Sequence, residues 1–345
     1  MSDKPMRRRG GARALLLVAL LALAAALVYG WNDFNRFSGA PLNVTAQGDS
    51  IDVSRGSSFR SIVGELHRRH LTDANSLYWR LLAEQMHVAG KLHAGEYALK
   101  VGLTPRQLLA DMAAGKVLQR NFTIVDGWTF SELRQALARA EKLNHDSAGL
   151  DDAAIMQKLG APGEAPEGRF LPETYAYVKG DSDLDILKRA HAAMVRTLAA
   201  LWPTRAADLP LATPYEALIL ASIVEKETGR ADERAQIAGV FIRRLQNHML
   251  LQTDPSVIYG MGASYAGNIR KGDLTANTPY NTYTRPGLPP TPIALPGKPA
   301  LEAALHPAGG NALYFVARGD GGHVFAADLA EHNRNVDCYQ RKHCQ

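Results

Sequence analysis

An uncharged apolar run near the N-terminus is the strongest hydrophobic signal in the chain. It extends from Ala14 to Tyr29 and follows five cations in the first 13 residues. Counted to Trp31, the segment has 18 residues, which at about 1.5 Å per residue span roughly 27 Å of a hydrocarbon core about 30 Å thick. The pattern predicts a transmembrane anchor over residues 14–31, with the basic tail, residues 1–13, on the cytoplasmic side.

A cleaved signal peptide is the alternative interpretation of this run. Such a peptide has an apolar region of about 7 to 15 residues that ends in a small-residue cleavage site, and Ala24-Ala25-Ala26 provides one. Because the apolar run continues beyond these alanines, the uncleaved anchor is favoured. Residues 32–42 are predicted to form a short tether to the first folded domain.

Residues 43–120 alternate between short strand-like and helical segments, as a small α+β subdomain does. Strand, helix, helix, strand and helix are predicted over residues 43–53, 59–69, 76–87, 95–101 and from Thr104 onward. Thr104 and Gln107 form a capping box at the start of the last helix. The βααβ order resembles a LysM-type module, a fold often used to hold aminosugar polymers, and is equally compatible with a plain packing domain.

Residues 121–345 are predicted to form a larger α+β domain. Its expected elements are a strand, a helix opened by a Thr129/Glu132 capping box, a further helix and a C-terminal hairpin. Apart from the capping box, these elements occupy residues 119–125, 184–201, and 312–318 with 323–327. The whole chain is therefore expected to be an α+β protein with an N-terminal transmembrane helix.

The distribution of charge argues against a nucleic-acid-binding protein. The chain has 39 basic and 34 acidic side chains and a pI of about 9.1. Removing Asp3 and the five cations of the first 13 residues leaves 34 basic and 33 acidic side chains in the body. The basicity therefore serves membrane topology rather than phosphate binding.

The composition gives no signal for a cofactor or a metal site. Cys338 and Cys344 are the two cysteines, too few for a disulfide framework and without CxxC spacing. A local disulfide between them and two unpaired thiols both remain open. The chain contains no G-x-x-x-x-G-K-[ST], no G-x-S-x-G and no H-E-x-x-H motif, so we expect function without metal or cofactor.

The most informative segment is a nearly all-apolar helix that ends in carboxylates. Thr213 and Glu216 form a third predicted capping box, and seven of the eight residues at 217–224 are apolar, so this helix should be buried. Glu225 continues the buried stripe at the helix C-terminus, where the helix dipole disfavours an anion. Burial and the dipole both raise a carboxyl pKa, which makes Glu225 a candidate proton donor.

A second carboxyl, Glu227, follows closely but points elsewhere. On a regular helix it lies about 200° around from Glu225, so the two side chains cannot address one substrate bond. Glu227 is therefore interpreted as a structural residue. For Glu225 itself, the alternative to a catalytic role is a solvated carboxylate at a helix end.

Five ordered motifs resemble those of the YceG-like (MltG) family of endolytic murein transglycosylases. The motifs are ASIVEKET (221–228), LQTDPSVIYG (251–260), PYNTY (279–283), GLPPTPIALPG (287–297) and HPA (306–308). The resemblance extends to the anchor, the LysM-like module and EGRFLPETY (167–175), and covers the chain from about residue 10 to residue 336.

This resemblance implies a reaction and a catalytic residue. The glutamate of the ASIVE motif is the family's acid/base, and it corresponds to Glu225. The implied reaction cleaves the MurNAc-β-1,4-GlcNAc bond of nascent glycan strands without water, leaves a 1,6-anhydroMurNAc end and terminates glycan polymerisation. One carboxyl suffices because the attacking oxygen belongs to the substrate, whereas standard glycoside hydrolysis uses two.

The resemblance also implies a location and partners. The protein would be a single-pass protein of the cell inner (cytoplasmic) membrane with its catalytic domain in the periplasm. Its substrate would be the glycan strands of peptidoglycan, and penicillin-binding proteins are candidate partners.

Amide, carboxylate and aromatic side chains in the motifs are expected to line the glycan groove. They are Gln252, Asp254, Tyr280, Asn281 and Tyr283. For Asp254 the favoured interpretation is instead an N-cap, with Pro255 as the first residue of a short helix through Ile258.

Two rival functions remain open. One is a muramidase, with Glu225 as the acid and Asp254 or Glu173 as the second carboxylate, whose product is heavier by one water. The other is a non-catalytic envelope protein that binds peptidoglycan, in which Glu225 is only structural.

Overall fold

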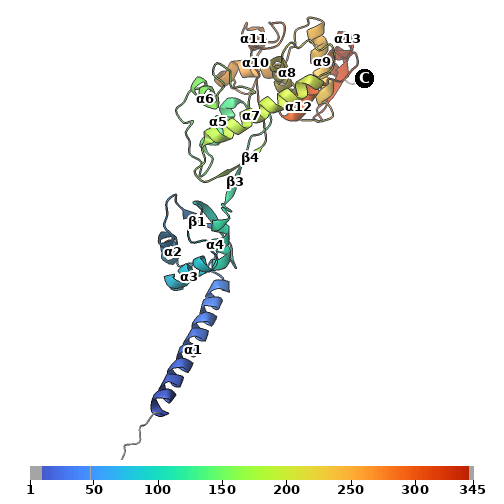
Figure 1. The fold of residues 1–345 in the computed structure, drawn as a ribbon. Helices are drawn as coiled ribbons and strands as arrows, with labels where there is room; N and C mark the ends of the chain where they lie inside the picture. The colour runs from blue at the N-terminus through green and yellow to red at the C-terminus, as the bar shows by residue number, and fades with distance from the viewer. Residues whose placement is uncertain (1–9, 47, 342–345) are drawn as a thin grey trace, which may run out of the picture. The chain divides into compact units, whose positions relative to one another are not determined.

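The computed structural model describes residues 10–46 and 48–341, and the fold is mixed α and β as predicted (Figure 1). The chain forms two compact units, Met1–Gln119 (unit 1) and Arg120–Gln345 (unit 2). Most of the predicted cytoplasmic tail, residues 1–9, lies outside the described residues.

Unit 1 begins with helix α1 (Gly10–Gly39). Within the described part of the chain, the single helix long and apolar enough to cross a membrane is its segment Ala14–Gly39. The side chains of this segment from Leu15 to Val28 are largely exposed in the isolated chain. Outward-facing apolar side chains all round a helix are what a lipid environment requires.

The expected tether is wrong over residues 32–39, because these residues continue α1. Phe34 is buried, and its ring centroid lies 6.0 Å from that of Tyr78. The Phe37 ring packs edge-on against Trp79, with 5.3 Å between centroids. Burial of these aromatic rings stabilises the additional helical turns.

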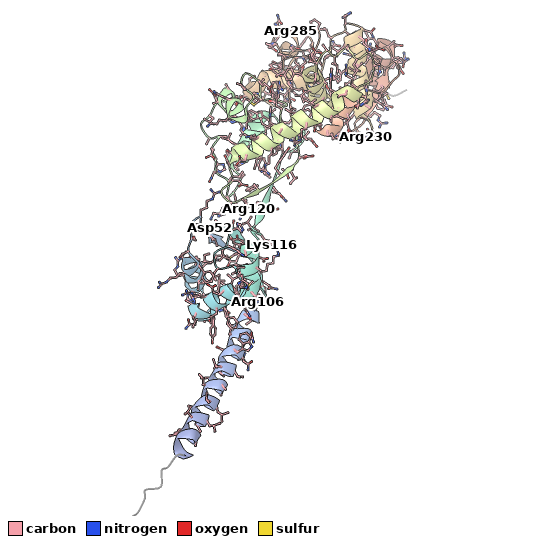
Figure 2. The ribbon with its side chains drawn as sticks, in the orientation of Figure 1. Asp52, Arg106, Lys116, Arg120, Arg230 and Arg285 are labelled. Atoms are coloured by element: carbon pink, nitrogen blue, oxygen red, sulfur yellow. The ribbon has the colours of Figure 1, made fainter. Side chains whose placement is uncertain are left out.

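The body of unit 1 has the order strand, helix, helix, strand, helix. The elements are β1 (Asp49–Val53), α2 (Phe59–Arg68), α3 (Ser76–Gln85), β2 (Gly95–Leu99) and α4 (Pro105–Ala113). The two strands pair antiparallel, with Ile51 opposite Tyr97. The predicted capping box of Thr104 and Gln107 opens α4. Arg106, labelled on α4 in Figure 2, joins α4 to α3 through a 2.9 Å hydrogen bond to Gln85.

Strand β1 is shorter than predicted at its N-terminal end. Residues 43–46 are not part of a strand, because the backbone here bonds to other parts of unit 1. The Leu42 N–H donates to the Leu103 carbonyl at 2.8 Å, and the Asn43 N–H donates to the Leu71 carbonyl at 2.9 Å.

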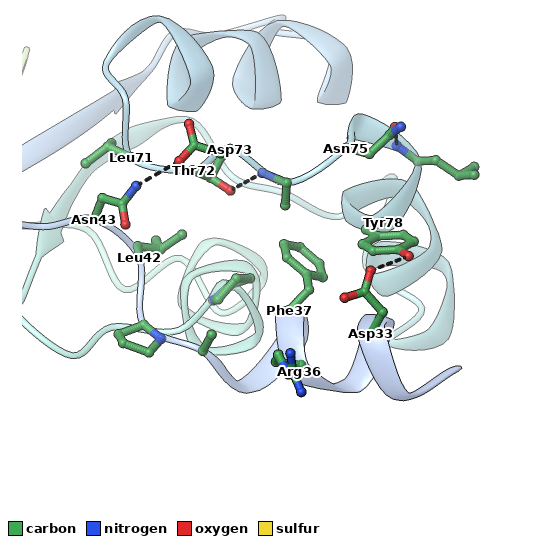
Figure 3. Close-up of a pocket in the computed structure, with 15 residues that line it drawn as sticks. Asp33, Arg36, Phe37, Leu42, Asn43, Leu71, Thr72, Asp73, Asn75 and Tyr78 are labelled. Atoms are coloured by element: carbon green, nitrogen blue, oxygen red, sulfur yellow. Dashed lines mark hydrogen bonds between the residues drawn. The ribbon is translucent and has the colours of Figure 1, made fainter. Parts of the chain in front are cut away.

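A pocket of about 710 Å³ lies in unit 1 where α1 ends and α3 begins (Figure 3). Phe37 and Tyr78 line it, and the Tyr78 hydroxyl donates to the Asp33 carboxylate at 2.8 Å. None of the predicted site residues lines this pocket.

The first half of unit 2 contains a two-stranded sheet and three helices. They are β3 (Gln119–Thr123), α5 (Phe130–Ala138), α6 (Asp152–Leu159), β4 (Thr174–Val178) and α7 (Asp183–Leu201). Strand β3 pairs with β4, which was not predicted, whereas the Thr129/Glu132 capping box is confirmed. The rings of Phe130 and Phe170 stack with centroids 5.0 Å apart in the local core.

The second half of unit 2 is mainly helical. Its elements are α8 (Pro214–Glu227), α9 (Arg234–Gln246), α10 (Asp254–Met261), α11 (Lys271–Thr275), α12 (Lys298–Leu305), β5 (Tyr314–Ala317), β6 (His323–Ala326) and α13 (Leu329–Tyr339). Short 3-10 helices occur at Trp202–Thr204 and Gly262–Ser264. The predicted C-terminal hairpin is confirmed as the antiparallel pair β5 and β6. Cys338 in α13 is disulfide-bonded, and Cys344 lies outside the described residues.

Candidate active site

Helix α8 begins at a hydroxyl cap. The Thr213 hydroxyl accepts a 3.2 Å hydrogen bond from the Glu216 N–H, and Pro214 occupies the first turn. The predicted capping box is only half formed, because the Glu216 carboxylate accepts from the Ala212 N–H at 2.5 Å instead of from Thr213. Both arrangements satisfy backbone donors at the helix start.

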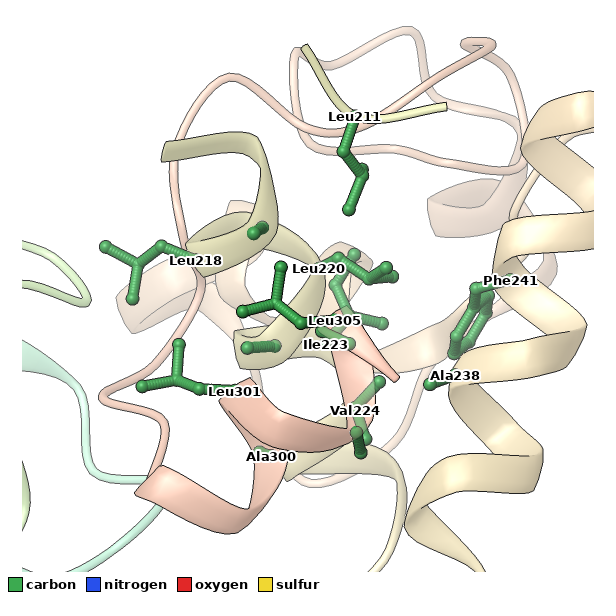
Figure 4. Close-up of a cluster of buried hydrophobic side chains, with 14 of the residues drawn as sticks. Leu211, Leu218, Leu220, Ile223, Val224, Ala238, Phe241, Ala300, Leu301 and Leu305 are labelled. Atoms are coloured by element: carbon green, nitrogen blue, oxygen red, sulfur yellow. The ribbon is translucent and has the colours of Figure 1, made fainter. Parts of the chain in front are cut away.

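The apolar part of α8 is buried as predicted. All residues from Ala217 to Val224 are buried, between α9 on one side and α12 on another (Figure 4). The single hydroxyl among them, Ser222, donates to the Ile219 carbonyl at 2.7 Å and accepts from the Ile293 N–H at 3.0 Å. Ser222 therefore fixes the proline-rich segment before α12 against α8.

Glu225 follows this buried stretch, and its side chain is only 6% exposed. One carboxylate oxygen, Oε2, accepts a 3.0 Å hydrogen bond from the Gly297 N–H. The other, Oε1, lies 3.9 Å from Nη2 of Arg234. Burial, and then the charge of Asp126, raise the pKa of Glu225, while the Gly297 N–H and Arg234 oppose the rise.

The segment after β3 brings Asp126 to this carboxyl. The Gly127 N–H donates to the Leu295 carbonyl at 2.9 Å, and the Leu295 N–H donates to the Trp128 carbonyl at 2.6 Å. The Lys226 ammonium adds a 3.2 Å hydrogen bond to the Gly127 carbonyl. Three bonds thus hold the 126–128 segment beside the C-terminus of α8.

Arg234, the first residue of α9, completes the charged cluster. Its side chain is 16% exposed. Its Nε is buried and has no hydrogen-bond partner among the described residues. A buried guanidinium N–H without a partner is uncommon.

Sequence reasoning missed both Asp126 and Arg234. Asp126 precedes a glycine in what is locally a plain turn after a strand, and Arg234 begins an ordinary helix. No periodicity connects either residue with Glu225. Asp126 is brought there by the hydrogen bonds of Gly127 and Trp128 with Leu295, and Arg234 by the packing of α9 against α8.

Glu227 lies on the other side of α8, as the helical spacing predicts. It lines a separate pocket of about 430 Å³, and Glu225 is not among the residues that line that pocket. The Thr253 hydroxyl donates a short hydrogen bond to the Glu227 carboxylate. Burial raises the pKa of Glu227 to about 7.

Three of the five predicted groove residues line the Glu227 pocket: Gln252, Asp254 and Tyr283. The Gln252 side chain accepts from Arg244 at 3.1 Å. Asp254 accepts a 2.5 Å hydrogen bond from the Tyr283 hydroxyl. The structure therefore brings these three together, but beside Glu227 rather than beside the Glu225 carboxylate.

The N-cap predicted for Asp254 is wrong. Helix α10 begins at Asp254 itself, and Thr253 is the N-cap, without a side-chain cap hydrogen bond. The helix also runs to Met261, beyond the predicted end at Ile258. The Asp254 carboxylate instead accepts from the Tyr283 hydroxyl, a partner distant in sequence.

The other two predicted groove residues are engaged within the protein. Asn281 is fully buried, and its amide donates to the carbonyls of Asp273, Leu274 and Ala276 at 3.0, 3.2 and 2.6 Å. The expectation that Asn281 lines a groove is therefore wrong, because the side chain has no exposed surface and binds the loop carbonyls instead. Tyr280 is partly buried, and its hydroxyl bonds to Thr291 at 2.9 Å.

Glu167 is a further buried carboxyl that sequence reasoning did not single out. It accepts from the Phe130 N–H at 3.0 Å and from the Tyr259 hydroxyl at 3.1 Å. Burial raises the pKa of Glu167 to about 7. By contrast, Glu173, the other candidate for a second catalytic carboxylate, is exposed.

Known proteins match most of the chain. The model of the YceG-like family matches residues 51–338. An endolytic murein transglycosylase of Bacillus subtilis is 29% identical over 312 residues, which cover 84% of this chain and 84% of the relative. An endolytic murein transglycosylase of Streptococcus pneumoniae serotype 2 is 26% identical over 83% of this chain, which spans only 57% of that relative.

A solved structure also matches. The crystal structure of a putative YceG-like protein of Listeria monocytogenes aligns with a TM-score of 0.52 at 27% identity. The alignment covers 83% of this chain and 98% of that structure.

Proposed function

Because the chain belongs to the YceG-like family, we propose that it is an endolytic murein transglycosylase with Glu225 as its acid/base. The bond cleaved is the MurNAc-β-1,4-GlcNAc linkage of nascent glycan strands, and the product ends in 1,6-anhydroMurNAc. Curated relatives named for this activity support the proposal. The observation that carries it is the Glu225 carboxyl, which is 6% exposed and has a raised pKa.

The raised pKa suits the first half of the reaction. A carboxyl with a raised pKa keeps its proton to higher pH and can donate it to the glycosidic oxygen, O4, which joins muramyl C1 to C4 of the next sugar. The C1–O4 bond then breaks, and its electron pair stays on O4, which becomes a hydroxyl. Glu225 is left as a carboxylate, which the Gly297 N–H and Arg234 stabilise.

The second half returns the proton without water. The muramyl C6 hydroxyl attacks C1, and the Glu225 carboxylate takes the hydroxyl proton. One carboxyl therefore serves as acid and then as base, and the catalyst returns to its starting state. Asp126 is the carboxylate whose charge acts on Glu225; the second carboxylates considered for a hydrolase, Asp254 and Glu173, play no part in this scheme.

The pocket beside Glu227 supports a saccharide-binding role for part of the predicted groove. Gln252, Asp254 and Tyr283 present amide, carboxylate and aromatic groups to a space of about 430 Å³. Sugars offer hydroxyls to such acceptors and apolar faces to such rings. We assign these three residues to binding of the glycan beyond the cleaved bond.

We also propose a location and partners for the protein. Helix α1 would anchor the chain in the inner membrane, with its N-terminus in the cytoplasm and the catalytic unit in the periplasm. The β1-α2-α3-β2 order of unit 1 supports a LysM-like role in holding glycan. Cleavage beside the membrane would terminate nascent strands, next to penicillin-binding proteins that polymerise them.

A pair of variants tests the assignment of Glu225. Glu225→Gln keeps the side-chain shape and removes the transferable proton, so strand cleavage should fall by about a thousandfold or more. Glu173→Gln, an exposed residue in the same unit, is the matched control and should cleave as the wild type does. Wild-type cleavage by Glu225→Gln would contradict the assignment and favour a non-catalytic binding protein.

A further inference from the structure

We propose that Asp126 is a positioning residue for this reaction: its ionised carboxylate, held against Gly297, keeps the catalytic proton on Glu225 until the substrate takes it. The proposal rests on the proposed role of Glu225 as the acid/base. It concerns a residue that lies 99 positions away in the chain and is brought to the site by backbone pairing.

Gly297 is the neighbour that the two carboxyl groups share. Its N–H donates to Glu225 Oε2 at 3.0 Å. A Cβ added to Gly297 would lie 2.3 Å from Asp126 Oδ1 and 3.0 Å from Asp126 Cγ. Both carboxyls thus lie against the same glycine, and the charge of Asp126 acts on Glu225. Two neighbouring like charges resist simultaneous ionisation.

The surroundings decide which of the two carboxyls carries the proton. The Glu225 side chain is 6% exposed, whereas Asp126 is an exposed residue. Water stabilises an anion better than the protein interior does, so Asp126 ionises first. Partial burial of its carboxyl raises the pKa of Asp126, and the nearby charge of Arg234 opposes that rise without cancelling it.

Three charged groups face Glu225 from the elements around it. Asp126 comes from the segment after β3, Arg234 from the start of α9, and Lys226 from the same helix as Glu225. The segment before α12 contributes only the Gly297 N–H. Arg234 and Lys226 favour the Glu225 anion, whereas burial and, among the charges of the described residues, Asp126 oppose it.

This balance predicts what removal of Asp126 would do. Without its negative charge, Arg234, Lys226 and the Gly297 N–H act on Glu225 unopposed by any charge. Glu225 would then lose its proton at lower pH, and less of the enzyme would be in the form that can protonate the leaving oxygen. The loss would appear as a displaced pH profile rather than as a uniform loss of rate.

The test compares the full chain in detergent with its Asp126→Asn variant on purified glycan strands across a range of pH. Asparagine keeps the shape and removes the charge. The alkaline limb of the kcat profile should move to lower pH by roughly half a unit to one unit. Well below that limb, kcat and KM should stay within about twofold of the wild type.

Two further variants make the test specific. Asp146→Asn removes the same charge from an exposed position in unit 2 and should leave the limb in place. Gly297→Ala keeps both carboxyls and the N–H, but its methyl group would displace the Asp126 carboxylate. It should move the limb in the same direction as Asp126→Asn, and it decides the matter if Asp126→Asn fails to fold.

Either of two results would overturn the proposal. One is an Asp126→Asn enzyme whose alkaline limb coincides with that of the wild type. The other is a loss of rate that is equal at every pH, which indicates a structural role alone. Failure of the proposed function looks different, because the wild type would then not cleave, or Glu225→Gln would cleave as well as the wild type.

Discussion

At the scale of single residues, Glu167 hydrogen-bonds two parts of unit 2 to each other. Its ionisation should make the stability of the folded chain depend on pH. Its carboxyl accepts from Phe130 at the start of α5 and from Tyr259 in α10, and it is 7% exposed. Burial raises its pKa from 4.5 to about 7. The folded state therefore holds the proton more tightly than the unfolded state does, and folding is favoured while Glu167 is protonated.

This shift predicts how Glu167 changes stability with pH. Its full contribution is present below pH 4.5 and is lost as the pH rises to about 7. At about 1.4 kcal/mol per pKa unit, the loss of the Glu167 contribution should lower the free energy of unfolding by about 3 kcal/mol. Between about pH 5 and about pH 8, urea unfolding of Glu167→Gln should therefore show a markedly smaller loss of stability than that of the wild type.

Glu173→Gln is the control for this measurement, because Glu173 is exposed. It should lose as much stability with rising pH as the wild type. Equal pH dependence in Glu167→Gln and the wild type would show that Glu167 ionises in the folded protein as readily as in the unfolded chain.

Properties of a residue that depend on its own helix or strand could be predicted from the sequence. Contacts between residues of different elements could not. The burial and the raised pKa of Glu225 follow from its own helix: an apolar stripe and a C-terminal position. The contact with Asp126 depends on nonlocal backbone pairing, and the contact with Arg234 depends on the packing of α9 against α8. The sequence has no periodic signal for either. The sequence suggests that Asn281 is a sugar-binding amide, and only the structure shows that it donates its hydrogen bonds to loop carbonyls.

At the scale of elements, α8 positions Glu225 and depends on its cap. The Thr213 hydroxyl accepts from the Glu216 N–H, and loss of such a cap typically costs about 1 kcal/mol. Thr213→Ala should lower the free energy of unfolding by that amount, whereas Thr213→Ser, which keeps the hydroxyl, should stay near the wild type. Urea unfolding compares the two, and equal stability of Ala and Ser would show that the cap is unimportant.

Elements whose own sequence carries a hydrophobic pattern or a turn signal were predicted closely. Elements or ends that depend on contacts distant in the chain were not. Helix α7, strand β2 and the C-terminal hairpin lie within one or two residues of their predicted ends. Strand β4 was missed, because its short segment pairs with β3, about fifty residues earlier in the chain. Helix α1 was predicted to end where the apolar run ends, but Phe34 extends it by packing on Tyr78 in unit 1.

At the scale of the whole molecule, α1 is the proposed membrane anchor. The proposed anchor predicts that the full chain sediments with membranes, and that a chain starting at Asn32 is released into the soluble fraction and still folds. The truncation point keeps Phe34 and Phe37, which belong to the unit 1 core. A mature protein that begins near Leu27 would instead show that the apolar run is a cleaved signal peptide.

The most direct test of the central claim is the mass of the ends that the enzyme creates. Purified glycan strands are digested with the full chain in detergent, and the fragments are measured by mass spectrometry. If Glu225 serves as both acid and base, internal fragments should end in 1,6-anhydroMurNAc, and the Glu225→Gln variant should produce none. Fragments heavier by one water, with free reducing ends, would contradict this mechanism and identify a hydrolase.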